Sequence, residues 1–341
     1  MMATAFLLGN DVVKSEVTEK MSFGNREFSG GDYMKFCIFG AGGTGGTLAA
    51  YLAMVDNDVT LIARGQHLKA IQEKGLVLHT NHRGTVTVDN IRAVTAAEYM
   101  DTPDVLFVCV KYYNLDDAVT FVREKAGKNT LIVPILNVFG TGGVMQEKLP
   151  EHICLDGCIY VMSEIEAPGI IYQSNKILRV IFGYRPKQEE KLIDKARQLE
   201  QILRDAEIKA HFSDNIIRDA LQKFAFVSPA AAAGSYFDVT CESFQRPGEE
   251  RDTFTGLVKE VVALGKAMGV EFEQDLVEVG LKMMDALKPD STMSMQRDIQ
   301  RGRQSEFSGL VTRVVNLGKE YGVSVPLYEK INDWGAAKSI K

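Results

Sequence analysis

A glycine-rich turn near the start of the chain constrains the fold more than any other feature. Residues 35–39 form a short apolar run, which predicts a buried strand. Gly40, Gly42 and Gly45 follow in the spacing G-x-G-x-x-G, and residues 44–54 carry leucine and tyrosine side chains at helical spacing. A strand, this turn and a helix in that order predict the opening unit of a Rossmann-type domain.

The turn also predicts a dinucleotide-binding site. Gly40 permits the tight turn, Gly42 lets the backbone approach a pyrophosphate, and Gly45 lets the helix pack closely on the strand. Gly43 lies beside them, where the helix N-terminus offers unpaired N–H groups to an anion. The alternative is a flexible turn without a ligand, which the strand before it and the helix after it make less favoured.

The end of the second predicted strand indicates which dinucleotide binds. NAD sites usually carry Asp or Glu there, to hold the ribose 2′-hydroxyl. The strand at residues 58–63 is instead followed by Arg64. Because a guanidinium pairs well with a phosphate, Arg64 favours NADP through its 2′-phosphate. The alternative is that Arg64 is an exposed loop cation.

Strand and helix patterns alternate as far as residue 136. Apolar runs at 105–110 and 130–136 predict two more buried strands, and helical patterns cover 66–74 and 115–126. Residues 76–95 alternate like an additional β segment. This alternation predicts right-handed crossovers and a parallel sheet.

After Pro150 the pattern changes twice. Three short runs at 159–163, 169–172 and 178–183 predict a meander, and an amphipathic helix is expected at 188–205. Past Asp214 only helical patterns remain, at 216–227, 256–268, 275–287, 293–301 and 309–321. We therefore expect an α/β fold, with a Rossmann-type domain at 34–213 and an all-helical domain at 214–341. Residues 1–33 are expected to be an extension or leader outside the fold.

Charge and cysteine content argue against several functions. The formal net charge of −6, with scattered basic residues, disfavours nucleic acid and anionic membranes as partners. The sequence has no apolar run long enough to span a membrane. Five cysteines without a zinc-site spacing predict free thiols in a reducing compartment, and hence a cytoplasmic protein without a bound metal.

An ordered set of short motifs resembles the ketopantoate reductase (2-dehydropantoate 2-reductase) family from Met34 to about Trp334. The motifs after the glycine turn are Val110-Lys111, Leu136-Asn137-x-x-Gly140, Leu221-Gln222-Lys223, Ser294-Met295-x-x-Asp298 and Ser305-Glu306. The resemblance implies a Rossmann domain joined to a helical domain, with the active site in the cleft. It also implies NADPH-dependent reduction of a small 2-oxo acid. The first candidate substrate is ketopantoate, which such enzymes reduce in pantothenate biosynthesis.

Chemical roles follow from the same resemblance. A reduced ketone needs a proton and a positive neighbour, which Lys223 would supply. Glu306 would hold that lysine and bind the substrate hydroxyl, and Ser294 would contact the substrate carboxylate. Asn137 would lie where cofactor and substrate meet, and Lys111 near the cofactor. The alternatives are a surface helix lysine for Lys223, a helix-start glutamate for Glu306 and a solvated strand-end lysine for Lys111.

One departure from the family pattern concerns the substrate. Val227 and Ala231 occupy positions where many ketopantoate reductases carry asparagines. Ser228 or water would have to compensate, and residues 230–233, all alanine, would make a roomier pocket. A dehydrogenase of another 2-oxo or hydroxy acid therefore stays an alternative, as does a non-catalytic NADP-binding sensor. A homodimer is compatible with the apolar faces of the helical domain.

Overall fold

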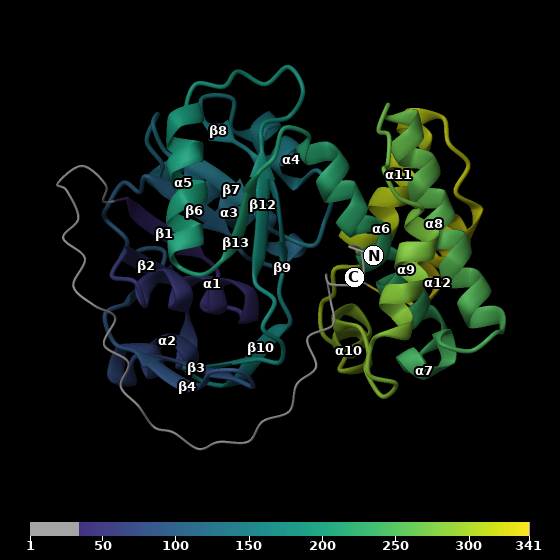
Figure 1. Cartoon of the computed structure of the whole chain (residues 1–341), viewed down its shortest axis with the longest axis horizontal. Coiled ribbons are helices and arrows are strands. Elements are labelled where there is room, and N and C mark those ends of the chain that lie inside the picture. Colours follow the sequence, from purple (N-terminus) through teal and green to yellow (C-terminus); the bar gives the residue numbers. More distant parts are fainter. Residues whose placement is uncertain (1–33, 341) are drawn as a thin grey trace.

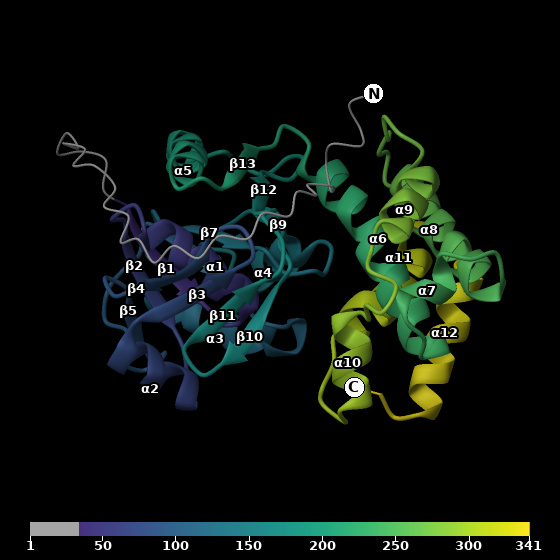
Figure 2. The same cartoon turned by 60° about the horizontal axis from the view of Figure 1, so that its bottom comes forward.

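The computed structural model describes residues 34–340, which form a β-rich domain followed by a helical domain (Figure 1). Figures 1 and 2 show the two domains side by side, with helix α6 (Ile216–Phe237) leading from the first into the second. Strand β13 (Lys209–Phe212) precedes α6 directly, so the change from mixed structure to helices falls between these two elements.

The centre of the first domain is a six-stranded sheet in which every neighbouring pair is parallel. Numbered along the chain within this sheet, its strand order is 3-2-1-4-5-6, that of Rossmann-type dinucleotide-binding domains. Ligands bind such sheets at the carboxyl ends of the strands where the order reverses, here between β1 and β6. The six strands, in spatial order, are β5 (Arg92–Val94), β2 (Asp58–Ile62), β1 (Lys35–Phe39), β6 (Val105–Val108), β7 (Leu131–Pro134) and β8 (Ile153–Cys154).

Strand β1 shows how one sequence fills both faces of this sheet. Phe36 and Ile38 pack into one core cluster, while Cys37 and Phe39 pack into another, because successive side chains of a strand point to opposite faces. Helices cover both faces, and their buried residues complete the two clusters. The helices are α1 (Gly43–Ala53), α2 (Gly65–Lys74) and α5 (Ile193–Asp205) in the first cluster, and α3 (Leu115–Lys125) and α4 (Thr141–Lys148) in the second.

The meander predicted for residues 159–183 is wrong. A hairpin at residues 163–173 joins a four-stranded sheet through a parallel pair. The last strand of the predicted meander, at residues 179–183, lies in a separate three-stranded sheet. Val180 and Phe182 on that last strand are fully buried, and the strand pairs with a neighbour on each edge, parallel on one side and antiparallel on the other. The first sheet contains β10 (Ser163–Ala167), β11 (Ile170–Gln173), β3 (Leu76–Thr80) and β4 (Gly84–Val88); the second contains β13, β12 (Arg179–Gly183) and β9 (Asp156–Tyr160).

Helix α6 is longer than the sequence predicts, because it continues through Pro229 instead of ending at Val227. Proline removes one helix hydrogen bond and usually ends or kinks a helix. Beyond it, Ala230, Ala232 and Ala233 are fully buried in the core of the helical domain. Burial of this small-residue face offsets the missing hydrogen bond.

The helical domain is built around the contact between α6 and α8 (Glu249–Ala267). Phe254 of α8 and Tyr328 are fully buried at its centre. Its other elements are α7 (Cys241–Phe244), α9 (Leu276–Asp285), α10 (Ser294–Gln300), the π-helical turn η3 (Ser308–Thr312), α11 (Arg313–Tyr321) and α12 (Pro326–Ala337). Within residues 34–340, no helix is both long and apolar enough to cross a membrane.

Candidate active site

The glycine turn is packed too tightly for larger residues at three positions. Gly40 adopts a φ of +113°, and a Cβ added there would lie 3.0 Å from the carbonyl of Cys109. A Cβ at Gly45 would lie 1.9 Å from the Gly40 oxygen, so glycine is required for α1 to pack this closely on β1. A Cβ at Gly43 would lie 2.3 Å from the backbone oxygen of Ser163 on β10.

Gly42 is the open position of the turn. A Cβ added there would find nothing within 4 Å, and Gly42 lines the cleft between the domains. It is also the N-cap of α1, where no side chain caps the helix and no acidic residue lies in the first turn. Unpaired N–H groups at a helix N-terminus bind anions, so the pyrophosphate of a dinucleotide fits this cradle.

Arg64 lies two residues beyond the end of β2, as the N-cap residue of α2. It is exposed and lines the same cleft as Gly42. Within residues 34–340, its guanidinium makes no ion pair. The side chain is therefore available to an anionic ligand in the cleft.

One continuous cleft receives side chains from both domains. Every site residue predicted from the sequence except Gly45 lines it. From the first domain these are Gly40, Gly42, Gly43, Arg64, Lys111 and Asn137, and from the helical domain Lys223, Ser294 and Glu306. Segments almost 270 positions apart in the sequence thus meet at the carboxyl edge of the central sheet.

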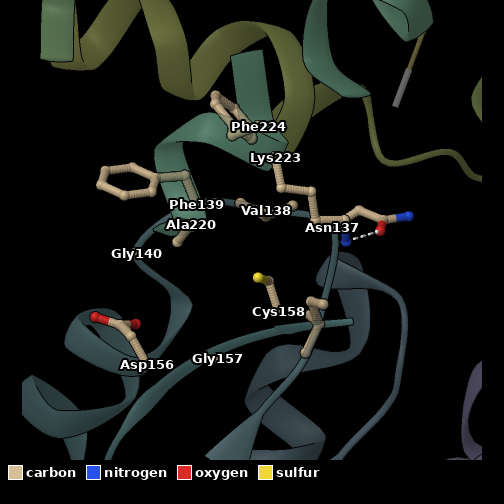
Figure 3. A pocket seen from close by; sticks show the side chains of 11 residues that line it. Asn137, Val138, Phe139, Gly140, Asp156, Gly157, Cys158, Ala220, Lys223 and Phe224 are labelled. Carbon is tan, nitrogen blue, oxygen red and sulfur yellow. Dashed lines mark hydrogen bonds between the residues drawn. The ribbon is translucent and has the colours of Figure 1, made fainter. Parts of the chain in front are cut away.

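Lys223 is a buried amine on the wall of this cleft. It lies on the second turn of α6, and only 8% of it is exposed. Its Nζ donates a hydrogen bond to Oδ1 of Asn137 at 2.9 Å, and Figure 3 shows the two side chains meeting. Burial lowers the pKa of Lys223, and the nearby Cys158 and Glu306 side chains oppose that shift only in part. A lysine in this state can give up its proton more readily than one in water.

Glu306 is bound by Lys111. Within residues 34–340 it makes no hydrogen bond or ion pair with Lys223, and it acts on that lysine through its charge. The Lys111 Nζ lies 3.0 Å from Oε2 of Glu306 and 3.3 Å from Oδ2 of Asp298. The other Glu306 oxygen accepts the backbone N–H of Tyr112 at 3.2 Å. Burial alone would lower the pKa of Lys111, but the charges and hydrogen bonds of these two carboxylates raise it. Lys111 follows β6, so the strand order brings it within reach of the helical domain.

The substrate side of the cleft is formed by α6 and α10. Ser294 is exposed at the first position of α10, and Val227 lies one helical turn after Lys223, half-buried, on the cleft wall. Ser228 does not compensate for missing asparagines, because it is fully buried and its hydroxyl bonds the Leu310 carbonyl and the Tyr328 hydroxyl, each at 2.6 Å. Ala231 is likewise buried in the helical core, so the alanine run does not enlarge the pocket.

Sequence reasoning missed three residues of this site. Tyr160 of β9 lies beneath Lys223, whose Nζ is 5.8 Å from the centre of the ring. Arg179 of β12 contacts the same ring, and Asp298 shares Lys111 with Glu306. Asp298 was visible as part of a motif, whereas the two strand residues carried no signal that connects them to a lysine on a later helix.

The glycine cradle and Arg64 line the cleft from the first domain, and the Lys223 amine lines it from the helical domain. This is the arrangement of a two-domain, dinucleotide-dependent oxidoreductase. Within residues 34–340, no group of three or more His, Cys, Asp or Glu side chains is placed to hold a metal ion.

Comparison with known families gives the particular assignment. The protein-family model described as ketopantoate reductase PanE/ApbA matches residues 36–187, and the family model for the C-terminal domain of the same proteins matches residues 215–337. The chain therefore belongs to the ketopantoate reductase family, whose members are NAD(P)-dependent oxidoreductases.

Individual relatives agree with this family but are distant. A 2-dehydropantoate 2-reductase of Pyrococcus abyssi is 27% identical over 311 residues, covering 89% of this chain and 97% of that protein. The 2-dehydropantoate 2-reductase of Methylococcus capsulatus has a crystal structure with a TM-score of 0.78 at 20% identity, covering 90% of this chain and 97% of that one. The structure of a D-mandelate dehydrogenase in ternary complex with NADH and anilino(oxo)acetate has a TM-score of 0.77 at 21% identity, and the match covers 89% of this chain and 98% of that one. Structural likeness at these identities shows a common fold.

Proposed function

We propose that this chain reduces a small 2-oxo acid with NADPH, and that the acid is 2-dehydropantoate (ketopantoate), reduced to pantoate for pantothenate biosynthesis. The observation that carries the proposal is the Lys223 amine. It is buried, its pKa is lowered, and it lies in the cleft onto which the glycine turn opens.

Lys223 is proposed to protonate the substrate. NADPH, when bound, would supply a hydride to the ketone carbon, and negative charge would then develop on the ketone oxygen. The Lys223 ammonium stabilises that charge and donates its proton to the oxygen. Asn137 accepts a hydrogen bond from the same ammonium, which fixes the direction in which the proton is delivered.

Glu306 and Ser294 are proposed to orient the substrate. The Ser294 hydroxyl is exposed at the start of α10, where it can donate a hydrogen bond to the substrate carboxylate. Glu306 accepts a hydrogen bond from the substrate hydroxyl while Lys111 and the Tyr112 N–H hold its carboxylate in place. Lys111 thus acts on the helical domain from the edge of the cofactor cradle.

Arg64 is proposed to select NADPH over NADH by pairing with the 2′-phosphate. Its position after β2 and its lack of an ion-pair partner within residues 34–340 support this role. Arg64→Ala is expected to reduce the preference for NADPH roughly 10- to 100-fold, since a hydrogen bond to a charged group contributes about 1.5–3 kcal/mol. Arg246→Ala, an exposed arginine of the helical domain, is the control. An unchanged cofactor preference in Arg64→Ala contradicts the assignment.

A second candidate is a 2-oxo acid with an apolar substituent, and Val227 favours it. This side chain offers no hydrogen bond to a substrate hydroxyl from the turn that follows Lys223. A site without such a group favours a hydroxylated substrate less strongly over the analogue that lacks the hydroxyl.

The deciding experiment is NADPH oxidation with ketopantoate beside a panel of 2-oxo acids, using wild type, Lys223→Ala and Lys319→Ala. Lys319 is an exposed lysine of α11 and serves as the matched control. We expect Lys223→Ala to lose roughly 100- to 10,000-fold in turnover and to keep its affinity for NADPH. Retained turnover in Lys223→Ala contradicts the mechanism. NADPH binding without turnover on any acid indicates a sensor protein instead.

A further inference from the structure

Two cations from different domains contact the ring of Tyr160. The Nζ of Lys223 lies 5.8 Å from the ring centre, and the guanidinium carbon of Arg179 lies 5.9 Å from it. Arg179 is the direct cross-strand neighbour of Tyr160 in the antiparallel pair of β12 and β9. Lys223 approaches from α6, which packs on both of these strands. The ring is therefore held from within its own sheet and contacts the amine of the other domain.

The strand geometry fixes which way Tyr160 points. Side chains two positions apart on a strand share a face, so Cys158 and Tyr160 point the same way. Cys158 packs with Ile181 and Ile216 between the three-stranded sheet and the start of α6. Tyr160 continues this contact toward the cleft, where it is half-buried and part of the lining.

We propose that Tyr160 is a positioning residue, whose ring face holds the Lys223 ammonium against Asn137 while Arg179 holds the ring. The inference rests on the proposed role of Lys223 as the proton donor. An aromatic face attracts an ammonium through its quadrupole, and the attraction is larger where water is excluded. Lys223 therefore has a hydrogen bond on one side and a ring on another, and it lines the cleft in which the substrate is proposed to bind.

The ring also favours the charged form of Lys223. Burial lowers the pKa of this amine, and attraction to the ring acts in the opposite direction. The titratable and charged groups around it are Cys158 and Tyr160 on β9, Arg179 on β12, Asp219 on α6, Lys111 after β6, and Glu306. Burial raises the pKa of Cys158 to about 11 and also raises that of Tyr160.

The test compares Tyr160→Phe, which keeps the ring, with Tyr160→Leu, which removes it. We expect Tyr160→Phe to match wild type. In Tyr160→Leu, turnover falls on the order of tenfold or more, because the donor is no longer oriented. The high-pH limb of the kcat profile moves roughly half to one and a half pH units lower, since the ammonium loses a stabilising contact. Tyr321→Leu, an exposed tyrosine at the end of α11, is the matched control.

A second measurement reports on Lys223 without catalysis. Competitive acylation of the free protein over a range of pH, read at Lys223 by mass spectrometry, gives the pKa of this amine with no substrate or cofactor present. We expect the pKa to be lower in Tyr160→Leu and unchanged in Tyr160→Phe. If the leucine variant does not fold, phenylalanines with increasing fluorination at position 160 keep the shape and weaken the ring quadrupole. The pKa of Lys223 is then expected to fall with each added fluorine.

Three outcomes overturn the inference or separate it from the proposed function. A wild-type pKa of Lys223 in Tyr160→Leu or across the fluorinated series overturns it. A loss in Tyr160→Phe as large as in Tyr160→Leu also overturns it, because the hydroxyl and not the ring would then matter. Full activity of Lys223→Ala instead contradicts the proposed function, and the acylation experiment still decides whether the ring holds the amine.

Discussion

Oε2 of Glu306 lies 3.0 Å from Nζ of Lys111, so a carboxylate of the helical domain is neutralised by an amine of the Rossmann-type domain. Only 3% of the Glu306 side chain is exposed, compared with 37% of the Lys111 side chain. The carboxylate is thus enclosed, while its partner reaches it from the edge of the cleft. The ion pair joins the two domains at the place where substrate and cofactor are expected to meet.

Removing Lys111 should destabilise the folded protein. In Lys111→Met the buried carboxylate keeps the Tyr112 N–H but loses its counter-charge, so we expect the free energy of unfolding to fall by roughly 1–3 kcal/mol. Urea denaturation measures it. Lys148→Met is the control, because its partner Asp116 is exposed and a surface pair contributes about 0–1 kcal/mol.

A double-mutant cycle tests whether this loss belongs to the pair. With Glu306→Gln in the background, Lys111→Met should cost less than it does alone, since no buried charge is left behind. Strictly additive losses in the double variant indicate that Lys111 stabilises the protein through some other contact.

Two alanine substitutions in the glycine turn should separate folding from cofactor binding. Gly45→Ala places a Cβ 1.9 Å from the Gly40 oxygen, so it should lower the melting temperature by forcing α1 away from β1. Gly42→Ala adds its Cβ in open space, so the melting temperature should stay near wild type while the Kd for NADPH rises. Thermal unfolding of the two variants measures the melting temperatures, and NADPH titration of the same proteins measures the Kd values. Unimpaired NADPH binding by Gly42→Ala contradicts the proposed cradle.

The sequence was informative where local pattern decides the structure. The strand, turn and helix from Lys35 to Ala53 follow from apolar periodicity and glycine spacing, because these elements are specified by neighbours in the chain. The meander failed because strand patterns do not specify which edges pair. The continuation of α6 past Pro229 depends on burial against another helix, which local propensity does not contain.

Contacts between the domains were the part of the site that sequence could not supply. Motif order placed Lys111, Lys223 and Glu306 in one site, and they do line one cleft. Their pairing is a different matter, since it depends on how the helical domain sits on the sheet edge. For the same reason Tyr160 and Arg179, two ordinary strand residues, became visible only in three dimensions.

The pH dependence of catalysis should follow the Lys223 amine. Ketone reduction needs the protonated form, so kcat should be constant at low pH and fall as pH rises through the pKa of Lys223. Because burial lowers that pKa, the fall should begin below the ordinary lysine value of 10.5. The reverse oxidation needs the neutral amine and should instead rise with pH. Asn137→Ala removes the acceptor that stabilises the protonated Lys223 amine. It should therefore lower the pKa of Lys223 and move the pH dependence of both the reduction and the oxidation to lower pH. Identical profiles in wild type and Asn137→Ala contradict the assignment of this limb to Lys223.

Substrate preference should depend on Val227. Ketopantoate and 3,3-dimethyl-2-oxobutanoate differ only by one hydroxyl group, so the ratio of their kcat/KM values isolates recognition of that hydroxyl. Val227 lines the cleft one turn after Lys223, and Val227→Asn adds an amide there. We expect the ratio to shift on the order of tenfold toward ketopantoate, because a site that hydrogen-bonds a hydroxyl discriminates against the analogue that lacks it. Val227→Leu keeps the wall apolar and should not shift the ratio in that direction. An unchanged ratio in Val227→Asn places the substrate substituent elsewhere in the cleft, away from this turn of α6.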